Sequence, residues 1–480
     1  MAHTADRPVT RRADRHRSNG DLRDLTSGPV WLNLLRLAWP MLFGIAAVMS
    51  VQLVDTYFVG KLGTDPLAAL SFSFPIALTL ASVSIGLSAG AASVVSRAIG
   101  RGHRRHTTQL ATDSLLLTVI VVLLLTALGL LTLEPVLQML GARGDILDMA
   151  IRYSRIWFLS LPFLLATMVS NAMTRAGGDA FWPSSIMVAS AVLNIIVTPL
   201  LVFGTGPFPT LGIEGAALAT LLARVVSCGL ALYLVLVRDR LVVLGWRSLR
   251  RFAGSAGQVL GIGIPAAIGN ASNPLGMAVA TGVIAVLGSQ TVAGFGVATR
   301  LEAFAILPML ALSAAIGPVV GQNWGSARGD RVQQALKAAY AFSVGWSLFL
   351  ALFFWVMGRP IAAAFAAESS VIDEAARYLW IVPISLWGHG IAIIAAGAFN
   401  ALGKPLIGLG YSLTRTLVFY VPLVWIASRV DGSTTVYGAI AAANALAGLL
   451  IALDSLLRIR RLTGHSQQHV PSGASHDSSD

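Results

Sequence analysis

A single carboxylate lies within a long apolar stretch near the start of the chain. Asp55 follows Val51-Gln52-Leu53-Val54, and Pro40 precedes it on the same predicted helix. A charged side chain at the centre of a bilayer costs about 2.5–3.5 kcal/mol on insertion scales, so an ionisable residue at that depth indicates function. Apolar surroundings disfavour the charged form of a carboxyl and so favour binding of a proton. We therefore expect Asp55 to be a titratable site facing a central cavity; the alternative is a helix-end residue that faces outer water.

Further polar groups at membrane depth in the first half of the chain are Asn171, Asn194, Thr198 and Thr220. Asn194 and Thr198 are four residues apart and hence lie on one helix face. Each such residue alone is most simply interpreted as the source of an interhelical hydrogen bond. Together with Asp55 they predict a polar pocket, in which Asn194, Thr198 and Thr220 can hydrogen-bond either form of the carboxyl.

The second half contains a different polar set, with charges of both signs. It consists of Asn270, Asn273, Arg300, Glu302, His389 and Arg415. His389 is more often a packed, hydrogen-bonded residue than a proton relay, although its titration near neutrality keeps it a candidate. Four residues from both halves are candidates for lining a substrate cavity: Gln52, Asn171, Asn273 and His389.

One motif could support enzyme chemistry. Gly86-Leu87-Ser88-Ala89-Gly90 fits the G-x-S-x-G pattern, and His389 could act as its base in an intramembrane serine protease. The pattern needs a strand-to-helix elbow that exposes the serine, whereas Ser88 lies inside a continuous apolar helical segment. The single cysteine, Cys228, offers no metal cluster. We therefore expect no enzyme, no cofactor and no metal, with the Ser88 protease as an alternative.

Long apolar segments must position these residues. The chain has 480 residues, of which 55% are hydrophobic and 12% charged, and its mean hydropathy is +0.74. Soluble globular proteins carry roughly 25% charged residues. A helix needs roughly 20 apolar residues to cross a bilayer, and Gly and Pro within the segments argue against a barrel. The predicted membrane-spanning helices lie near 30–58, 66–98, 108–133, 150–173, 183–204, 211–237, 258–286, 292–322, 338–358, 375–399, 405–428 and 434–457.

The two halves of the chain are related by an internal repeat with a fixed offset of 225 residues. Leu87-Ser88-Ala89 recurs as Leu312-Ser313-Ala314, and Arg152-Tyr153 recurs as Arg377-Tyr378. Because the offset spans six helices, an even number, both halves enter the membrane in the same direction. The sequence predicts an all-α integral membrane protein of about twelve transmembrane helices, in two six-helix lobes related by a parallel pseudo-two-fold repeat.

The predicted organisation has five parts: a disordered basic tail at 1–28, an N-lobe at 29–238, a linker at 239–256, a C-lobe at 257–462 and a disordered tail at 463–480. The formal net charge is +12, but Lys and Arg mark the cytoplasmic loops of membrane proteins, so this charge does not indicate a nucleic-acid partner. Most of the 34 Lys and Arg residues fall on the inner side if the N-terminus is inside. We expect a cell-membrane protein with both termini and the linker in the cytoplasm.

Several short motifs resemble those of one transporter family. They are Pro40, Val54-Asp55-Thr56, Val59-Gly60-x-Leu62-Gly63, Arg175-Ala176-Gly177-Gly178-Asp179, Gly321-Gln322-Asn323-x-Gly325 and Asn400-Ala401-Leu402-Gly403. From about Val30 to Leu462 the chain resembles the multidrug and toxic compound extrusion (MATE) transporters, and it looks closer to their DinF-like branch.

This resemblance implies a V-shaped pair of lobes and a secondary active multidrug exporter, which expels organic cations by alternating access in exchange for an inward-moving cation. In the DinF-like branch an N-lobe aspartate couples to the ion and the first helix bends at its proline. Those roles fall on Asp55 and Pro40, and the remaining members of that site fall on Asn194, Thr198 and Thr220. We expect a monomer whose other partner is membrane lipid.

The chain departs from the family pattern at three positions. Thr198 stands where a second aspartate is usual, and Asn273 and His389 stand where the other branch has acidic residues. Only one full negative charge could then offset a dehydrated Na⁺, so H⁺ is the favoured coupling ion and Na⁺ the alternative. A second function within the superfamily is a flippase for lipid-linked precursors, which would need basic side chains for a pyrophosphate. Available for that role are Arg224, Arg300 and Arg415.

Overall fold

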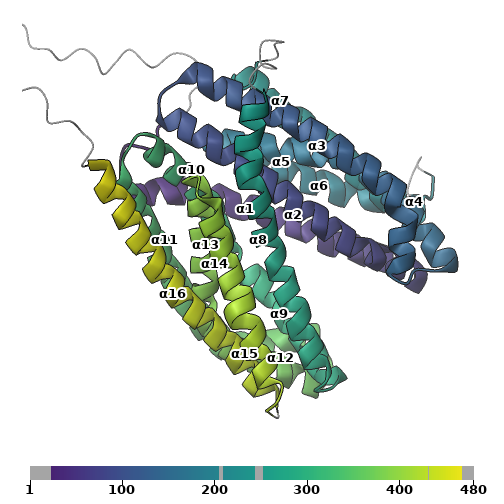
Figure 1. The fold of residues 1–480 in the computed structure, drawn as a ribbon. Helices are drawn as coiled ribbons and strands as arrows, with labels where there is room; N and C mark the ends of the chain where they lie inside the picture. The colour runs from purple at the N-terminus through teal and green to yellow at the C-terminus, as the bar shows by residue number, and fades with distance from the viewer. Residues whose placement is uncertain (1–22, 205–208, 244–251, 431, 468–480) are drawn as a thin grey trace, which may run out of the picture.

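The computed structural model describes residues 23–204, 209–243, 252–430 and 432–467, and this part of the chain is helical, without a β-strand. Ten of its helices are long and apolar enough to cross a membrane, and two pairs of shorter helices meet the same criterion when each pair is counted as one bent span. Counted in this way, the described residues form twelve spans, which Figure 1 shows in two groups. The predicted fold class is confirmed.

The N-lobe contains the first six spans. Its helices are α1 (Val30–Gly60), α2 (Thr64–Gly100), α3 (Arg104–Met139), α4 (Gly144–Leu159) with α5 (Leu161–Ala176), α6 (Phe181–Phe203), and α7 (Gly212–Tyr233) with the π-helical turn η1 (Leu234–Arg238).

The C-lobe contains the other six spans, and three of them are interrupted. Its elements are α8 (Phe252–Ala285), α9 (Ser289–Ala305) with α10 (Leu307–Gly325), α11 (Gly329–Phe365), α12 (Ser369–Ile381) with η3 (Pro383–Ser385) and α13 (Leu386–Ala401), α14 (Pro405–Leu413) with the π-helix η4 (Thr414–Tyr420) and α15 (Val421–Ala427), and α16 (Ser433–Gln467).

The fourth span of each lobe breaks at the same point of the repeat. Ser160 separates α4 from α5, which meet at 41°, and Ser385 ends η3 before α13. Both serine hydroxyls donate to the carbonyl three residues earlier, over 2.6 Å in the N-lobe and 2.7 Å in the C-lobe. The two serines lie one repeat offset apart, so a shared local bond accompanies the repeated break.

The eighth span is also broken, whereas the sequence predicted one helix over 292–322. Helices α9 and α10 meet at 42°. Pro308 lies in the first turn of α10, directly after the break at Ile306. Proline lacks a backbone N–H, and its ring clashes with the preceding turn, which explains why the helix does not continue straight.

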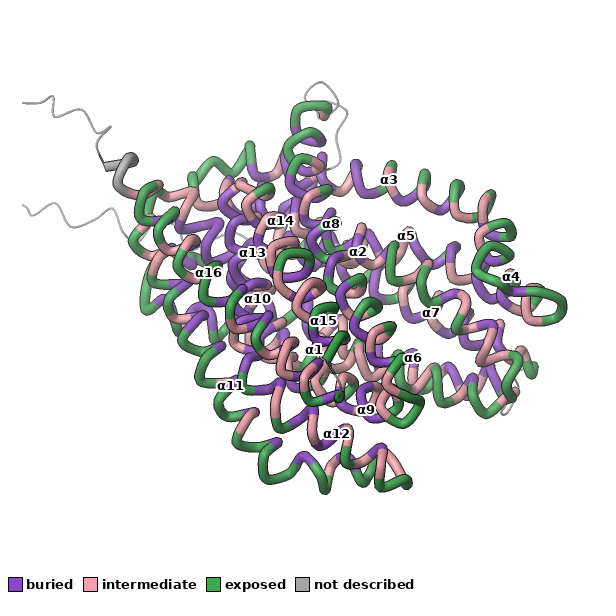
Figure 2. Tube along the Cα trace, turned by 60° about the horizontal axis from the view of Figure 1, so that its bottom comes forward, coloured by how far each residue is buried: buried purple, intermediate pink, exposed green. Residues whose placement is uncertain are grey.

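Large apolar side chains cover the outer faces of both lobes. Leu124 and Leu131 of α3 are 67% and 81% exposed, and Trp355 of α11 is 70% exposed. Figure 2 shows that exposed positions recur along the outward sides of α3 and α11. Such exposure would be unfavourable in water and is favourable in lipid, so the outer surface agrees with the membrane assignment.

The lobes meet at one end of the molecule and diverge toward the other (Figure 1). We call the end that carries the start of α1 and the end of α16 the closed end, and the opposite end the open end. Near the closed end, Gly86 and Gly90 of α2 lie so close to the α8 backbone, at Gly263 and Val259, that an added Cβ would overlap it. Gly100 lies equally close to Gln322 of α10. Small residues permit this close packing of helices, and they form the seam between the lobes.

Residues 23–29, which we call the N-terminal strap, bridge both lobes at the closed end. Leu25 is 4% exposed, and its N–H donates to Gln322 Oε1 over 3.0 Å. On the other side, the Arg23 N–H donates to the Gly177 carbonyl over 2.8 Å. The prediction of a disordered tail up to residue 28 is therefore wrong for its last six residues, because polar side chains of α10 bind their backbone. The earlier residues lie outside the described part.

Two other predicted boundaries differ from the structure. Helix α8 begins at Phe252, so the last five residues of the predicted linker are helical, and Leu241 and Val242 are buried in the N-lobe core. Helix α16 continues to Gln467, beyond the predicted helix end at 457 and into the predicted tail, which was expected to begin at 463. Residues 244–251 of the linker and 468–480 of the C-terminal tail lie outside the described part.

Candidate functional site

Four polar side chains from three N-lobe helices form a coupling cluster: Asp55 of α1, Asn194 and Thr198 of α6, and Thr220 of α7. The Thr198 hydroxyl oxygen lies 3.3 Å from Asp55 Oδ1 and 3.4 Å from Asn194 Oδ1. Asn194 Nδ2 donates to Thr220 Oγ1 over 3.1 Å. Asn194 and Thr198 are buried, and the other two residues are half-buried. The structure brings these four residues together, whereas Asn171, the fifth residue of the predicted polar pocket, makes no hydrogen bond to them among the described residues.

Close packing of α1 and α7 on α6 makes these contacts possible. Gly44 of α1 lies against Ser184 and Met187 of α6. Gly215 of α7 lies against the Leu201 backbone of α6, where an added Cβ would overlap it. Because both neighbours approach α6 closely, short threonine and asparagine side chains can reach across the interfaces.

Arg224 extends this cluster with a positive charge. It lies four residues after Thr220 on the same face of α7, and it interacts electrostatically with Asp55. Its Nη1 donates to Ser160 Oγ over 2.5 Å, and its guanidinium lies 4.9 Å from the centre of the Trp157 ring. Sequence reasoning had considered Arg224 only as a candidate for binding pyrophosphate and had not placed it beside Asp55.

Tyr153 is a further neighbour that sequence reasoning missed as a site residue. It is 8% exposed and interacts electrostatically with both Asp55 and Arg224. Its repeat equivalent in the C-lobe, Tyr378, donates a short hydrogen bond to Glu302. Equivalent tyrosines thus accompany a carboxylate in each lobe, and the repeated Arg-Tyr pair was the signal that could have found them.

The C-lobe holds a second polar group, which we call the C-lobe polar cluster: Asn273, Glu302, His389, Arg415 and Asn444. Arg415, in the π-helix η4, is 8% exposed. Its Nε donates to Asn444 Oδ1 over 3.2 Å, and its Nη1 donates to Asn273 Oδ1 over 3.0 Å. Asn273 itself is exposed, so this cluster reaches the surface of α8.

Two other members surround the Arg415 guanidinium at longer range. Glu302 of α9 accepts from the Tyr378 hydroxyl and interacts electrostatically with Arg415. His389 of α13 is 6% exposed, its Nδ1 has no hydrogen-bond partner among the described residues, and it also interacts electrostatically with Arg415. One carboxylate and one arginine therefore interact within each lobe, beyond ion-pair contact distance.

A family model described as MatE matches the chain twice, over residues 40–200 and 265–426. The chain belongs to the MatE family. The two matches begin at Pro40 and Pro265, which are one repeat offset apart, and so agree with the internal repeat. Members of this family are membrane transporters and not enzymes, as the sequence had indicated.

Relatives of this MatE transporter carry names of two kinds. A protein of Shewanella oneidensis named "FAD transporter" is 34% identical over 429 residues, which cover 89% of this chain and 95% of that protein. A protein of Bacillus subtilis named "Probable multidrug resistance protein YoeA" is 25% identical over 409 residues, which cover 83% and 87%.

The fold agrees with solved MATE structures over nearly the whole chain. The crystal structure of the Vibrio cholerae MATE transporter VcmN in the bent form has a TM-score of 0.86 and 30% sequence identity, and the match covers 91% of this chain and 98% of that one. An outward-facing structure of a MATE family multidrug resistance transporter has a TM-score of 0.87 and 26% identity, with 93% and 99% covered.

The remaining predicted cavity residues do not join either cluster. Gln52 is exposed on α1, one turn before Asp55. Asn171 of α5 is 3% exposed, and its Oδ1 has no hydrogen-bond partner among the described residues. Neighbouring helices cover the side chain of Asn171 in the described conformation, as they do that of His389, so a cavity role for these two residues stays a prediction. Arg300 is exposed on α9.

Ser88 lies in the seam and not in a catalytic arrangement. It sits between the two seam glycines of α2, it is buried, and its Oγ has no hydrogen-bond partner among the described residues. His389 belongs to α13 of the other lobe, where it is part of the C-lobe polar cluster. The protease interpretation of the G-x-S-x-G motif is therefore discarded, and its glycines are explained by helix packing.

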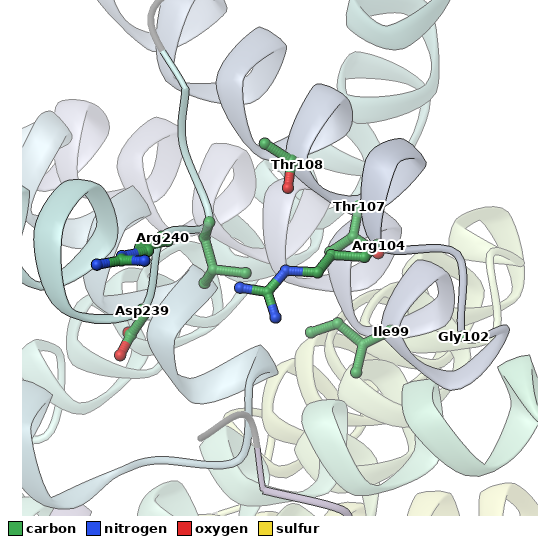
Figure 3. A pocket seen from close by; sticks show the side chains of 8 residues that line it. Ile99, Gly102, Arg104, Thr107, Thr108, Asp239 and Arg240 are labelled. Carbon is green, nitrogen blue, oxygen red and sulfur yellow. The ribbon is translucent and has the colours of Figure 1, made fainter. Parts of the chain in front are cut away.

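Two pockets lie away from the coupling cluster. One is bordered by Trp39 and Pro40 of α1 and by Phe181 of α6, so the prolyl ring faces open space. The other, at the closed end of the N-lobe, lies between the α2–α3 turn and Asp239–Leu241; Figure 3 shows Arg104, Thr107 and Thr108 along it. Neither pocket includes a member of either cluster.

Proposed function

We propose that this MatE transporter is an exporter driven by proton antiport, with Asp55 as the residue that binds the proton. The coupling cluster carries the proposal, because its one carboxylate is contacted by a hydroxyl that can donate to it. Burial among apolar helices disfavours an unprotonated carboxylate, and the partners offered by Asn194, Thr198 and Thr220 can stabilise either form.

The composition of this cluster favours H⁺ over Na⁺. A sodium ion must lose part of its hydration shell and needs several oxygen ligands with enough negative charge. The family resemblance implies a second carboxylate where this chain has Thr198, so Asp55 alone would supply the charge. Arg224 adds a positive charge that interacts with Asp55 and opposes the binding of either ion, so it does not discriminate between them. A proton needs no such ligand shell.

The charge distribution supports an orientation with the closed end in the cytoplasm. Arg97, Arg101, Arg104, Arg328 and Arg331 lie in the turns and helix ends of the closed end. Positively charged residues are enriched on the cytoplasmic side of membrane proteins. In this orientation the lobes open to the outside, and both described chain ends are cytoplasmic.

For the substrate, we propose an aromatic compound that carries phosphate groups, of the flavin dinucleotide type. The relative named "FAD transporter" is 34% identical, against 25% for the relative named as a multidrug resistance protein. Arg415 of the C-lobe is buried, and Arg224 of the N-lobe is half-buried beside the coupling cluster. An arginine within a membrane-spanning segment is costly unless it serves a function. Organic cations are the second candidate, favoured by the multidrug names and by the carboxylates Asp55 and Glu302.

The charge of the substrate decides how coupling can work. A cationic substrate could compete directly with the proton for Asp55. An anion could not, because protonation of Asp55 would make its surroundings more attractive to negative charge. Export of an anion must therefore be coupled through a conformational change, and α1 can supply it, since it carries both Asp55 and Pro40.

The test is transport into inside-out membrane vesicles from cells that lack their own exporters, with an acidified interior. We expect the wild-type protein to accumulate FAD, and Asp55→Asn to be inserted normally but to accumulate none. The matched control is Asp454→Asn, because Asp454 bonds to Tyr411 and Arg458 near the closed end, away from the cluster; we expect it to transport normally.

The other outcomes are distinct. Full pH-driven uptake by Asp55→Asn would refute the coupling role of Asp55. Uptake that requires Na⁺ and ignores pH would retain the site and change the ion. Accumulation of ethidium but not of FAD would make organic cations the substrate.

A further inference from the structure

We propose that the C-lobe polar cluster is an anion-binding subsite, in which Arg415, Asn273 and His389 receive a phosphate group of the exported molecule. This inference rests on the proposed function, which it deepens by dividing the tasks between lobes. The proton binds in the N-lobe at Asp55, and the anionic part of the substrate binds in the C-lobe.

Arg415 has hydrogen-bonding capacity that its partners do not use. A guanidinium offers five N–H donors, and the hydrogen bonds of Arg415 run from Nε to Asn444 and from Nη1 to Asn273. Neither partner carries a charge, and the guanidinium lies 5.7 Å from the centre of the Tyr420 ring. These contacts fix the side chain while leaving its Nη2 group available for a planar, bidentate contact with a phosphate.

His389 supplies a second group for the same ligand. It is 6% exposed, and its Nδ1 has no hydrogen-bond partner among the described residues. The preceding residue, Gly388, packs against the backbone of Asn444, whose side chain accepts from Arg415. A buried polar atom without a partner destabilises the folded protein. A neutral imidazole that carries its hydrogen on Nδ1 would donate to a phosphate oxygen and remove that cost.

Asn273 gives a ligand access to this cluster. It is exposed, whereas the neighbouring Ser272 is buried in the C-lobe. Near the closed end, Gly263 and Ala267 of α8 pack against α2. Asn270 follows Ala267 by three residues and so lies on the same face of α8. Asn270 is also exposed, so this part of α8 is uncovered where the lobes diverge.

The backbone at Arg415 is itself unusual. Residues Thr414–Tyr420 form a π-helix between α14 and α15. Single π-helical turns are rare and occur frequently at functional sites. The π-helix packs on α8 through Thr416 and Tyr420, which lie against Gly276, and this contact holds Arg415 within reach of Asn273.

Glu302 does not prevent anion binding at this position. It is the acidic group that interacts with Arg415, but no ion pair within contact distance joins them in the described part of the chain. Its carboxylate accepts from the Tyr378 hydroxyl instead. It lowers the cost of burying Arg415, and it leaves the guanidinium donors free for a ligand.

The test is equilibrium binding to the purified full-length protein in detergent, with FAD and riboflavin as probes. Both contain the same ring system, and only FAD carries phosphate. We expect the wild-type protein to bind FAD more tightly, and Arg415→Gln to weaken FAD binding about tenfold or more, as expected for loss of a charge-assisted contact, without changing riboflavin binding. Arg429→Gln is the matched control, since Arg429 is exposed on the same lobe and stacks on Trp425.

A second variant tests the subsite independently in case Arg415→Gln does not fold. Asn273→Asp is nearly isosteric and would place a carboxylate against Nη1, so it should also abolish the preference for FAD. Asp55→Asn should keep that preference, because it alters coupling and not the subsite. Unchanged FAD affinity in Arg415→Gln and Asn273→Asp would overturn the subsite.

Failure of the flavin substrate has a different signature. If the wild-type protein binds neither flavin, farnesyl diphosphate and inorganic pyrophosphate become the probes. Binding of farnesyl diphosphate that Arg415→Gln abolishes would support the subsite and indicate a lipid-linked substrate. Binding of pyrophosphate alone with the same loss would support it for a soluble phosphate compound. Absence of binding by all these phosphates would overturn it.

Discussion

Thr198 makes the contact on which the coupling cluster depends. Its hydroxyl has one hydrogen and two acceptors within reach, Asp55 Oδ1 at 3.3 Å and Asn194 Oδ1 at 3.4 Å. When Asp55 is charged, donation to its carboxylate is the stronger bond, because hydrogen bonds to ionised groups are stronger than neutral ones. When Asp55 is protonated, the Thr198 hydroxyl can turn to Asn194 of α6. Because Asn194 also donates to Thr220 of α7, the change in hydrogen bonding can reach that helix.

We therefore expect Thr198→Val to reduce pH-driven export several-fold while protein levels stay normal. Valine has a similar shape but removes the hydroxyl, which leaves Asp55 and Asn194 without a shared donor. Initial rates in acid-interior vesicles measure the effect. Thr132→Val is the control, because that hydroxyl only donates to the Leu128 carbonyl of its own helix. Equal rates in the two variants would contradict the role of Thr198.

For the coupling cluster, the sequence predicted the hydrogen-bonding partners of Asp55 but not its electrostatic neighbours. Asn194 and Thr198 share a helix face, which spacing alone reveals. Arg224 and Tyr153 come from α7 and α4, and only the packing of those helices brings them to Asp55. The contacts of Arg415 depend on a π-helix, which shifts the register of the side chains and leaves no recognisable pattern in the sequence.

Helix α1 connects the coupling cluster to the rest of the molecule. It packs on α6 of its own lobe and on α10 of the other lobe. Pro40 lies inside this helix and faces a pocket bordered by Trp39 and Phe181. A proline removes one backbone hydrogen bond, and the adjoining space allows α1 to bend there without displacing a packed neighbour.

We expect Pro40→Ala to express normally and to slow export, because restoring the hydrogen bond favours the straight helix. Transport rates normalised to protein level provide the measurement. Pro135→Ala is the control, since Pro135 is an exposed proline near the end of α3, far from Asp55 in the sequence. Wild-type rates in Pro40→Ala would remove helix bending from the mechanism.

The seam requires that α2 and α8 stay in close contact, whereas α1 must be free to bend. Gly90 has no room for a Cβ beside the Val259 backbone. We expect Gly90→Ala to force the closed end apart, which would raise the labelling of a cysteine introduced there and lower export. Gly229→Ala is the control, because nothing lies within 4 Å of its added Cβ and alanine favours a helix. If both variants label alike, the seam does not hold the closed end.

The sequence predicted the positions of the membrane-spanning helices better than the points at which they are interrupted. Twelve apolar stretches identified twelve spans, because lipid requires long apolar helices. The sequence did not reveal the bend at Ile306, because the apolar character continues through Pro308 and membrane helices tolerate proline. It also missed the N-terminal strap, because residues 23–29 contain only one large apolar side chain, Leu25, and their order depends on side chains of α10 and α11.

For the molecule as a whole, the internal repeat fixes which loops share a side of the membrane. Reporter fusions after Leu140 and Ser370 lie at the open end, and we expect them to be external. Fusions after Arg104 and Arg331 lie at the closed end, and we expect them to be cytoplasmic. Activity of a reporter that works on only one side provides the measurement. A mixed pattern within either pair would contradict the parallel repeat, and reversal of both pairs would invert the orientation.

The N-terminal strap has a consequence for the transporter at rest. Its backbone accepts from Asn323, Arg328 and Arg331 and donates to Gln322. At about 1 kcal/mol net for each hydrogen bond, separating the lobes at this end would cost several kcal/mol, and each 1.4 kcal/mol lowers a population about tenfold. Without substrate to offset that cost, few molecules would open to the cytoplasm. An idle exporter would therefore leak few protons, and the cell could keep many copies in its membrane without dissipating its proton gradient.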